Sequence, residues 1–406
     1  MKRLLRQIKS YWQQFLSVAA NEYRTIRSDE GVILVLVLAL LIYSTLYSFA
    51  YAPQVLHNVP IGVIDNSRTP ASRNLVNLFN AAPNTYTAYE VSDMKEAEQL
   101  FFERKIYGVV YIPENYEELL LQGSQAVVSV YADASYFLVY RQIFQEVVTG
   151  INLTGAAVEF ERLLAKGTIQ PTARATTQPV IYQTHNLFNP YLGYGSFVMP
   201  AVIMVIIQQT LLIGIGIIGG TWREFGLYKK LLPTDRKRLS ALPVVLAKAA
   251  VYASIYAVTT LYILNVHYRL FHYPMNGNPW TVAAFMIPYL AACIFMGIAV
   301  STLFRYRENA LLLLLWTSIP ILMLSGASFP QQAIPEWLYT FGKIFPSSSG
   351  VSAFIRIQSM GASFEEVLPE IRVLWSLAIV YAGLSCIGIH LITKREFRRE
   401  HGDAEE

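Results

Sequence analysis

Six long apolar stretches dominate the pattern of hydrophobic and polar positions along the chain. They cover residues 32–52, 196–220, 241–265, 281–304, 310–329 and 373–393. Each has about the 20 residues that a helix needs to cross the hydrocarbon core of a bilayer. None contains Asp or Glu, and their only Lys or Arg is Lys248, which we expect to extend its amine to the membrane surface. The pattern predicts an α-helical integral membrane protein with six transmembrane helices.

The segment that precedes the first stretch, residues 1–31, has a different periodicity. Its apolar residues recur at steps of three and four, with Lys and Arg between them. These residues are Leu4, Leu5, Ile8, Trp12, Phe15, Leu16 and Ala19. Such a pattern predicts an amphipathic helix that lies in the membrane interface. The alternative is a helix whose apolar side packs on protein.

Residues 53–195 separate the first and second stretches and alternate between strand-like and helix-like patterns. Strands are expected at 59–64, 85–91, 108–112 and 126–131, and helices near 71–81, from Ser92, after Pro113 and over 135–166. Alternating strands and helices predict a small α/β domain. Asp65 and Asp133 each follow a strand, where we expect them to cap the next helix rather than to bind a ligand.

The distribution of basic residues predicts the orientation in the membrane. Eighteen Lys and Arg lie in residues 1–31, 221–240, 305–309 and 394–406, whereas the two short loops on the opposite side hold four. Lys and Arg are enriched in cytoplasmic loops, so both termini should be cytoplasmic. Residues 53–195 then form an extracytoplasmic α/β domain inserted after the first helix. Its nine basic and thirteen acidic residues argue against a nucleic-acid partner.

Composition and cysteine content exclude several classes of protein. Of the 406 residues, 54% are hydrophobic and 15% are charged, whereas soluble domains carry about 25% charged residues. Cys293 and Cys386 both fall inside apolar stretches, so a disulfide framework and a Cys-x-x-Cys site are excluded. His57 and His185 lack the spacing of metal ligands. We therefore expect no catalytic residue, no bound metal and no enzymatic activity of the chain's own.

The missing acidic residues also bear on the source of energy for any transport. Ion-coupled transporters keep an ionisable residue at membrane depth, and these six stretches hold no carboxylate. The chain has no Gly-x-x-x-x-Gly-Lys-Ser/Thr phosphate-binding loop, since its one Gly-Lys pair, Gly342-Lys343, is followed by Ile344. Any ATPase that drives transport must therefore be a separate polypeptide.

The loop 221–240 is the largest short cytoplasmic surface that this topology predicts. It combines the neighbouring charges of Arg223 and Glu224 with aromatic side chains at Trp222, Phe225 and Tyr228. A short helix of this kind can seat in a groove of a soluble partner. The alternative is that its basic residues only fix the orientation of a helical hairpin.

Two further sets of residues lie in the second stretch. Gly216 and Gly220 form a Gly-x-x-x-Gly motif, which permits close packing of helices within one subunit or at a dimer axis. Gln208 and Gln209 are its most polar deep residues and either face a translocation route or form hydrogen bonds between helices.

Several short motifs resemble those of the ABC-2 type transporter permeases, specifically the group with a large extracytoplasmic domain between the first and second transmembrane helices. The motifs are Arg223-Glu224-Phe225-Gly226 followed by Leu231-Leu232-Pro233, the run from Leu324 to Pro330 followed by Ile334-Pro335-Glu336-Trp337-Leu338 and Phe345-Pro346, Asn189-Pro190, Val63-Ile64-Asp65-Asn66, and Ile112-Pro113. The family has Thr where this chain has Leu227.

The resemblance implies a dimeric permease, with an identical or paralogous second subunit, that works with a pair of ABC ATPase subunits. These partners would bind ATP and Mg, so this chain needs no cofactor. Arg223, Glu224, Phe225 and Gly226 would couple the ATPase to the membrane helices, and residues 330–371 would form an extracytoplasmic re-entrant segment. The expected location is the cell membrane, which is the inner membrane in a Gram-negative cell, in contact with membrane lipid.

Together these features predict an exporter subunit that moves a hydrophobic or amphiphilic substrate out of the cytoplasm or inner leaflet. A periplasmic adaptor protein is a further candidate partner. The alternative function is a membrane-anchored scaffold or receptor that transports nothing and whose extracytoplasmic domain binds a secreted or surface partner.

Overall fold

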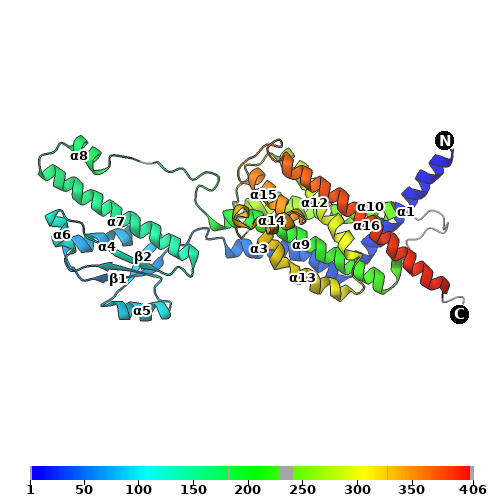
Figure 1. Cartoon of the computed structure of the whole chain (residues 1–406), viewed down its shortest axis with the longest axis horizontal. Helices are drawn as coiled ribbons and strands as arrows, with labels where there is room; N and C mark the ends of the chain where they lie inside the picture. Colours follow the sequence, from blue (N-terminus) through cyan, green and yellow to red (C-terminus); the bar gives the residue numbers. More distant parts are fainter. Residues whose placement is uncertain (1, 182, 229–240, 327, 403–406) are drawn as a thin grey trace. The chain divides into compact units, whose positions relative to one another are not determined.

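The chain forms two compact units. The computed structural model describes residues 2–181, 183–228, 241–326 and 328–402. The helical unit contains Met1–Gln54 and Asn186–Glu406, and the insert unit contains Val55–His185 (Figure 1).

Six helices in the described part of the helical unit are long and apolar enough to cross a membrane, which confirms the prediction of six. They are Glu30–Ala50 (α2, Glu30–Ile33; η1, Leu34–Ala39; α3, Leu40–Ala50), α9 (Tyr194–Glu224), Ala241–Leu270 (α10, Ala241–Tyr262; η3, Ile263–His267; α11, Tyr268–Leu270), α12 (Pro279–Ser301), α13 (Arg307–Leu324) and Leu368–Arg395 within α16 (Leu368–Gly402). The third helix continues five residues beyond the predicted end, through the π-helical turn η3. His267 in that turn is buried, and its Nε2 lies 3.0 Å from the Ser48 hydroxyl of α3.

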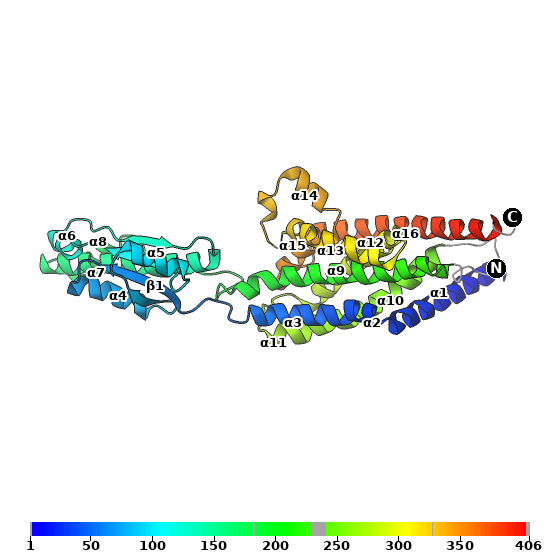
Figure 2. The same ribbon diagram turned by 90° about the horizontal axis from the view of Figure 1, so that it is seen from below.

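Helix α9 lies at the centre of the helical unit, with α3 on one side and α12 and α13 on the other (Figure 2). Its glycines permit close approach in three directions. A Cβ atom on Gly214 would lie 2.2 Å from the Leu36 side chain, one on Gly219 would lie 2.5 Å from Ser301 Cβ, and one on Gly220 would lie 2.8 Å from the Arg307 backbone. Gly220 of the predicted motif therefore packs within this chain, and Gly216 is buried in the same helix.

The N-terminal helix α1 (Lys2–Ser28) packs one face on α10 and exposes another. Val18, Glu22 and Ile26 are buried, whereas Trp12 and Leu16 are exposed. The helix therefore has a protein-packed face, as the alternative interpretation predicts, and retains an exposed apolar face for the interface. Lipid contact stays a prediction.

The segment between α13 and α16 forms the short helices η4 (Gln331–Ala333), α14 (Glu336–Gly342) and α15 (Pro346–Gln358). Helix α15 is mostly buried and contacts α9, α12 and α16. Gln331 Nε2 donates a hydrogen bond to the Ser348 carbonyl, which ties η4 to α15 at 2.9 Å. That residues 330–371 form an extracytoplasmic re-entrant segment stays a prediction.

The insert unit contains a four-stranded sheet in the order β2-β1-β3-β4. Strand β1 (Val59–Asp65) pairs in parallel with β2 (Thr85–Glu90) and β3 (Gly108–Ile112), and β4 (Ser129–Ala132) pairs antiparallel with β3. The helices are α4 (Pro70–Ala81), α5 (Met94–Phe102), α6 (Tyr116–Gln122), α7 (Phe137–Ala165) and α8 (Gln170–Thr177). An α/β fold is thus present, and its extracytoplasmic location stays a prediction.

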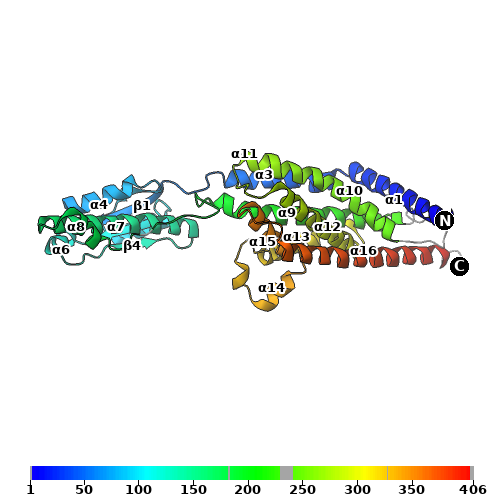
Figure 3. The same ribbon diagram turned by 90° about the horizontal axis from the view of Figure 1, so that it is seen from above.

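Alternation along β1 gives the insert unit a separate core on each face of its sheet. Ile61 and Val63 pack with Leu75 of α4 and Ile143 of α7 on one face. Ile64 packs on the opposite face with a cluster that includes Ala97 of α5. Figure 3 shows α4 and α7 beside the sheet.

The two strand-end carboxylates form turns and do not cap helices. Asp65 accepts hydrogen bonds from the Ser67 amide at 3.0 Å and the Ser72 hydroxyl at 2.6 Å, while Thr69 caps α4. Asp133 accepts from the Ser135 amide and lies upstream of the α7 cap, and hydrogen bonds from Ser135 hold the pKa of Asp133 below its usual value. The capping roles predicted for both residues are therefore wrong. Each carboxylate accepts an amide hydrogen bond within the turn that follows its strand, and the next helix begins after that turn.

Gly220→Ala should destabilise the helical unit, because its new methyl group would overlap the Arg307 backbone. Overpacking of this kind costs about 1–3 kcal/mol. The measurement is the apparent thermal midpoint of the purified chain in detergent, followed by intrinsic tryptophan fluorescence.

The matched control is Gly383→Ala in α16, where a Cβ atom has no neighbour within 4 Å. We expect this substitution to leave the midpoint unchanged or to raise it, because Ala favours helix more than Gly. Equal midpoints for the two variants would show that the close contact at Gly220 does not form.

Candidate functional site

The candidate site lies at the end of the helical unit where α1 begins and α16 ends, which we call the termini end. The start of α10 packs on α1 there (Figures 2 and 3), and the C-terminal end of α9 contacts the start of α10. The predicted coupling loop 221–240 falls at this end. Its residues 221–228 are described, and residues 229–240, which include the Leu231-Leu232-Pro233 motif, lie outside the described residues.

Arg223 joins the end of α9 to the end of α12. Its Nη1 donates to the carbonyl oxygen of Thr302 at 2.9 Å and to that of Phe304 at 3.4 Å. The last carbonyls of a helix have no intrahelical partner and carry partial negative charge, so a guanidinium stabilises them. Arg223 thus holds two transmembrane helices together.

Glu224 and Phe225 have the opposite orientation and face outward from the helical unit. The Phe225 side chain is 67% exposed, and the Glu224 side chain is exposed and forms no hydrogen bond or ion pair with any described residue. Gly226 has a φ of +60°, a backbone conformation that suits glycine where the chain leaves the helix. A carboxylate and an aromatic ring are therefore available to a partner at the end of the central helix.

A buried polar cluster stands behind this exposed pair. We call it the Glu22 cluster, and it contains Glu22, Trp222, Tyr228, Lys248 and Tyr252. Glu22 is fully buried, and its two carboxylate oxygens accept hydrogen bonds from Lys248 Nζ and from the Tyr252 hydroxyl, each at 2.6 Å. Lys248 is only 4% exposed. The prediction that its amine reaches the membrane surface is therefore wrong, because a carboxylate from α1 meets it inside the bundle.

Two aromatic rings complete the Glu22 cluster, Trp222 from the last turn of α9 and Tyr228 from the segment that follows it. Lys248 Nζ lies 4.3 Å from the centroid of the Trp222 ring and 6.0 Å from that of Tyr228, distances at which the negative face of a ring attracts a cation. The two rings also contact each other, with centroids 5.7 Å apart. Trp222 and Tyr228 are buried, so Phe225 is the aromatic residue of this loop that is exposed for partner contact.

A second ion pair ties the junction of α1 and α2 to the start of α13. Arg307 Nη1 lies 3.1 Å from Asp29 Oδ2, and Asp29 also caps α2 by accepting from the Val32 amide. The Arg307 backbone is the segment that packs against Gly220 of α9. The Asp29–Arg307 pair therefore connects α2, α13 and α9 at the termini end.

The two glutamines of α9 lie deeper in the helical unit. Gln208 Oε1 accepts a hydrogen bond from the Ser347 amide at the start of α15, at 2.7 Å. Gln208 Nε2 and both polar atoms of the Gln209 amide are buried without a hydrogen-bond partner in the described structure. Gln208 thus forms an interhelical hydrogen bond, while a translocation role for either residue stays a prediction.

Glu22 was not identified as a functional residue from the sequence, although the sequence holds a signal. It shares a helical face with Phe15, Val18, Ala19 and Ile26, so its carboxylate lies on an otherwise apolar side of α1. A carboxylate on a packing face requires a buried partner, and Lys248 is the single cation of the six apolar stretches.

The described residues contain no group of three His, Cys, Asp or Glu side chains that could hold a metal ion.

Comparison with known proteins assigns the chain to a family. Residues 31–387 match the family described as ABC-2 family transporter protein. The chain belongs to this family. The match covers all six candidate membrane helices up to residue 387 and the whole insert unit, and it confirms the resemblance predicted from the motifs.

Two curated relatives align with this ABC-2 protein over most of their length. The inner membrane transport permease YhhJ of Escherichia coli K12 is 23% identical over 380 residues, which is 90% of this chain and 94% of the relative. The probable multidrug ABC transporter permease YbhR of the same organism is 21% identical over 348 residues, which is 86% of this chain and 89% of the relative. These relatives and the six apolar helices support a multi-pass membrane location.

The ABC-2 protein should lose stability when one partner of the buried ion pair is removed. Lys248→Met leaves the Glu22 carboxylate in an apolar interior, and breaking a buried pair in this way costs about 3–5 kcal/mol. The double variant Glu22→Leu with Lys248→Met removes both charges and should recover most of the loss. Thermal midpoints in detergent measure both effects.

Lys394→Met in α16 provides the matched control, because Lys394 is exposed and forms no ion pair or ring contact among the described residues. It should leave the midpoint within a degree or two of the unsubstituted chain. If the double variant is no more stable than Lys248→Met alone, Glu22 and Lys248 do not form the pair.

Proposed function

We propose that this chain is the permease subunit of an ABC exporter, driven by ATP that is hydrolysed in separate partner subunits. Its family and its relatives named as transport permeases support the permease role. The observation that carries the proposal is the end of α9, where Glu224 and Phe225 are exposed, Trp222 is buried, and the half-buried Arg223 is bonded to the end of α12. An ATPase subunit that binds the exposed pair would act directly on the central helix.

The Glu22 cluster and the Arg223 contacts would pass this motion to other helices. A shift at the end of α9 moves Arg223, which holds the end of α12, and Trp222, which contacts Lys248 of α10. Lys248 is held by Glu22 of α1. Because separating these charges inside the bundle is costly, the ends of α1, α9, α10 and α12 should move as one body.

The orientation that fits this coupling places both termini, and thus the termini end, in the cytoplasm. The excess of Lys and Arg in the segments at this end supports it. The insert unit would then lie outside the cytoplasm, where it receives or releases cargo. A hydrophobic or amphiphilic substrate fits the six apolar stretches, which contain no Asp or Glu, and the relative YbhR is named a probable multidrug permease.

The partners in this proposal are a pair of ABC ATPase subunits, which bind ATP and Mg, and a second permease subunit, identical or paralogous. A periplasmic adaptor would bind the insert unit. The chain itself would have no enzymatic activity, since its sequence lacks a phosphate-binding loop. A scaffold or receptor without transport is the alternative, and co-purification of a P-loop ATPase with the chain would count against it.

Glu224→Ala should lower the substrate-stimulated ATPase activity of the assembled complex without lowering its abundance. A charge-assisted hydrogen bond contributes about 1.5–3 kcal/mol, so its loss from the coupled state should lower the stimulated rate by about tenfold or more. The readout is ATP hydrolysis by the co-purified complex in proteoliposomes. Glu336→Ala in α14, which also removes an exposed carboxylate, should leave the coupling intact.

Unchanged coupling in Glu224→Ala would exclude Glu224 from contact with the ATPase. A fall in both variants would indicate a general effect on folding, which the abundance of the complex measures separately.

Thiol labelling tests the orientation. In a chain whose Cys293 and Cys386 are replaced by Ala, Ser124→Cys in the insert unit should react with a membrane-impermeant maleimide in spheroplasts. Arg305→Cys, in the connection between α12 and α13, should react only after lysis. Both positions are exposed in the structure, so access depends on the side of the membrane. The reverse labelling pattern would invert the proposed topology.

A further inference from the structure

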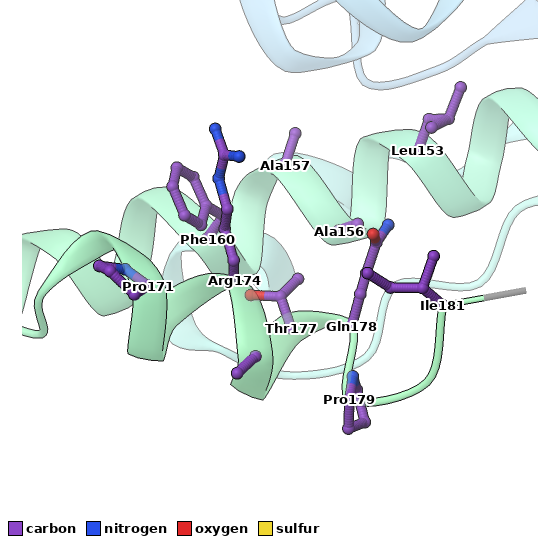
Figure 4. A pocket seen from close by; sticks show the side chains of 11 residues that line it. Leu153, Ala156, Ala157, Phe160, Pro171, Arg174, Thr177, Gln178, Pro179 and Ile181 are labelled. Carbon is purple, nitrogen blue, oxygen red and sulfur yellow. The ribbon is translucent and has the colours of Figure 1, made fainter.

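The insert unit contains a cleft between helices α7 and α8 that none of the roles above uses. Helix α8 folds back along α7 and packs on it through the buried Ala173. The cleft has a volume of about 700 Å³. Its walls come from the C-terminal half of α7, from α8, and from the segment after α8 that reaches Ile181 (Figure 4). Ligand sites for small molecules commonly have volumes of about 300–1,000 Å³.

The lining of this cleft is mainly apolar. Eight of its eleven residues are Ala, Leu, Ile, Pro or Phe, so the cleft suits the apolar body of a ligand. Ala156 and Ala157 have short side chains and leave depth along α7, and Phe160 presents a ring at one end (Figure 4). Ile181, at 82% exposed, gains little from its present surroundings and would be covered by a bound apolar chain.

Arg174 is the one charged residue in the lining. Its guanidinium carbon lies 6.0 Å from the centroid of the Phe160 ring, and Figure 4 shows the two side chains next to each other. Arg174 forms no ion pair with a described carboxylate, whereas Glu159 on α7 is already paired with Arg162 at 2.6 Å. The cleft therefore offers a positive charge without a counter-ion beside an apolar surface. The surrounding residues 53–195 carry more acidic than basic side chains.

We propose that the α7–α8 cleft binds an organic anion with an apolar tail, with the tail along Ala156, Ala157 and Ile181 and the anionic group on Arg174. An exposed guanidinium forms paired hydrogen bonds with a carboxylate or phosphate, which would fix the orientation of the ligand. The assignment of this ligand as cargo of the transporter rests on the proposed function. The binding site itself does not.

Photo-crosslinking tests the proposal in the full chain, purified and placed in nanodiscs of neutral lipid. The probe is dodecanoic acid that carries a diazirine near the end of its tail, and the neutral control probe is the corresponding alcohol. Mass spectrometry then compares labelling of peptides within 153–181 with labelling of peptides from the six membrane helices. The latter report partition of each probe into lipid.

The acid should label the cleft peptides about tenfold more than the alcohol does, relative to the membrane helices. Ala157→Trp, which fills the cleft, and Arg174→Gln, which removes its charge, should each reduce this labelling to the level of the alcohol. Both residues are exposed, so neither change disturbs the core. The matched controls are Asn152→Trp and Arg141→Gln, exposed positions of α7 outside the cleft, which should leave labelling unchanged.

Two competitors identify the source of the ligand. Free dodecanoate represents a soluble amphiphile, and dihexanoyl phosphatidylglycerol represents an anionic lipid headgroup. Protection from labelling by either compound supports the site, and the compound that protects more identifies the source of the ligand. Equal labelling by acid and alcohol, labelling that persists in Ala157→Trp, or protection by neither compound would overturn the proposal. Because the assay contains no ATPase and no nucleotide, its failure leaves the proposed transport function untouched.

Discussion

The ion pair between Glu22 and Lys248 is the interaction on which the termini end of the helical unit depends. Each charge would be too costly to leave alone in the apolar interior, and each is held by the other at 2.6 Å. Tyr252 satisfies the second carboxylate oxygen, and the Trp222 ring covers the ammonium group. The pair thereby fixes the position of α1 against α10, and Trp222 brings the end of α9 to the same place. An N-terminal segment that looks from its periodicity like a surface helix becomes part of the bundle through a single buried carboxylate.

Helix α9 connects the Glu22 cluster to the rest of the helical unit. Its three close glycine contacts bring it against the first transmembrane helix, α12 and the start of α13, so that it has little room to move alone. At its C-terminal end, Arg223 binds the end of α12, whereas the next two residues, Glu224 and Phe225, face outward. The central helix therefore has a fixed inner side and an exposed outer side at this end.

The insert unit is stabilised by cores of its own. Its sheet has its own apolar core on each face, formed by helices that the chain supplies locally. Helix α8 adds nothing to these cores apart from its contact with α7, and this lateral placement leaves the cleft beside Arg174. A helix that contributes so little to the core of its unit is open to a role in ligand binding.

The sequence by itself determined the six membrane helices, the strands of the insert unit and the family, because these depend on local runs of residues. A run of about twenty apolar residues forms a helix wherever it lies in a membrane, and alternation predicts a strand without reference to the rest of the chain. Only the tertiary structure decided that Lys248 is buried, that Trp222 and Tyr228 face inward, and that Arg223 binds the carbonyls that follow α12 and not Glu224. These outcomes depend on partners far along the chain, such as Glu22 and Lys248, which are 226 positions apart. The apolar face around Glu22 signals that its carboxylate needs a buried partner, but no local pattern brings Lys248 to it, since packing alone joins the two residues.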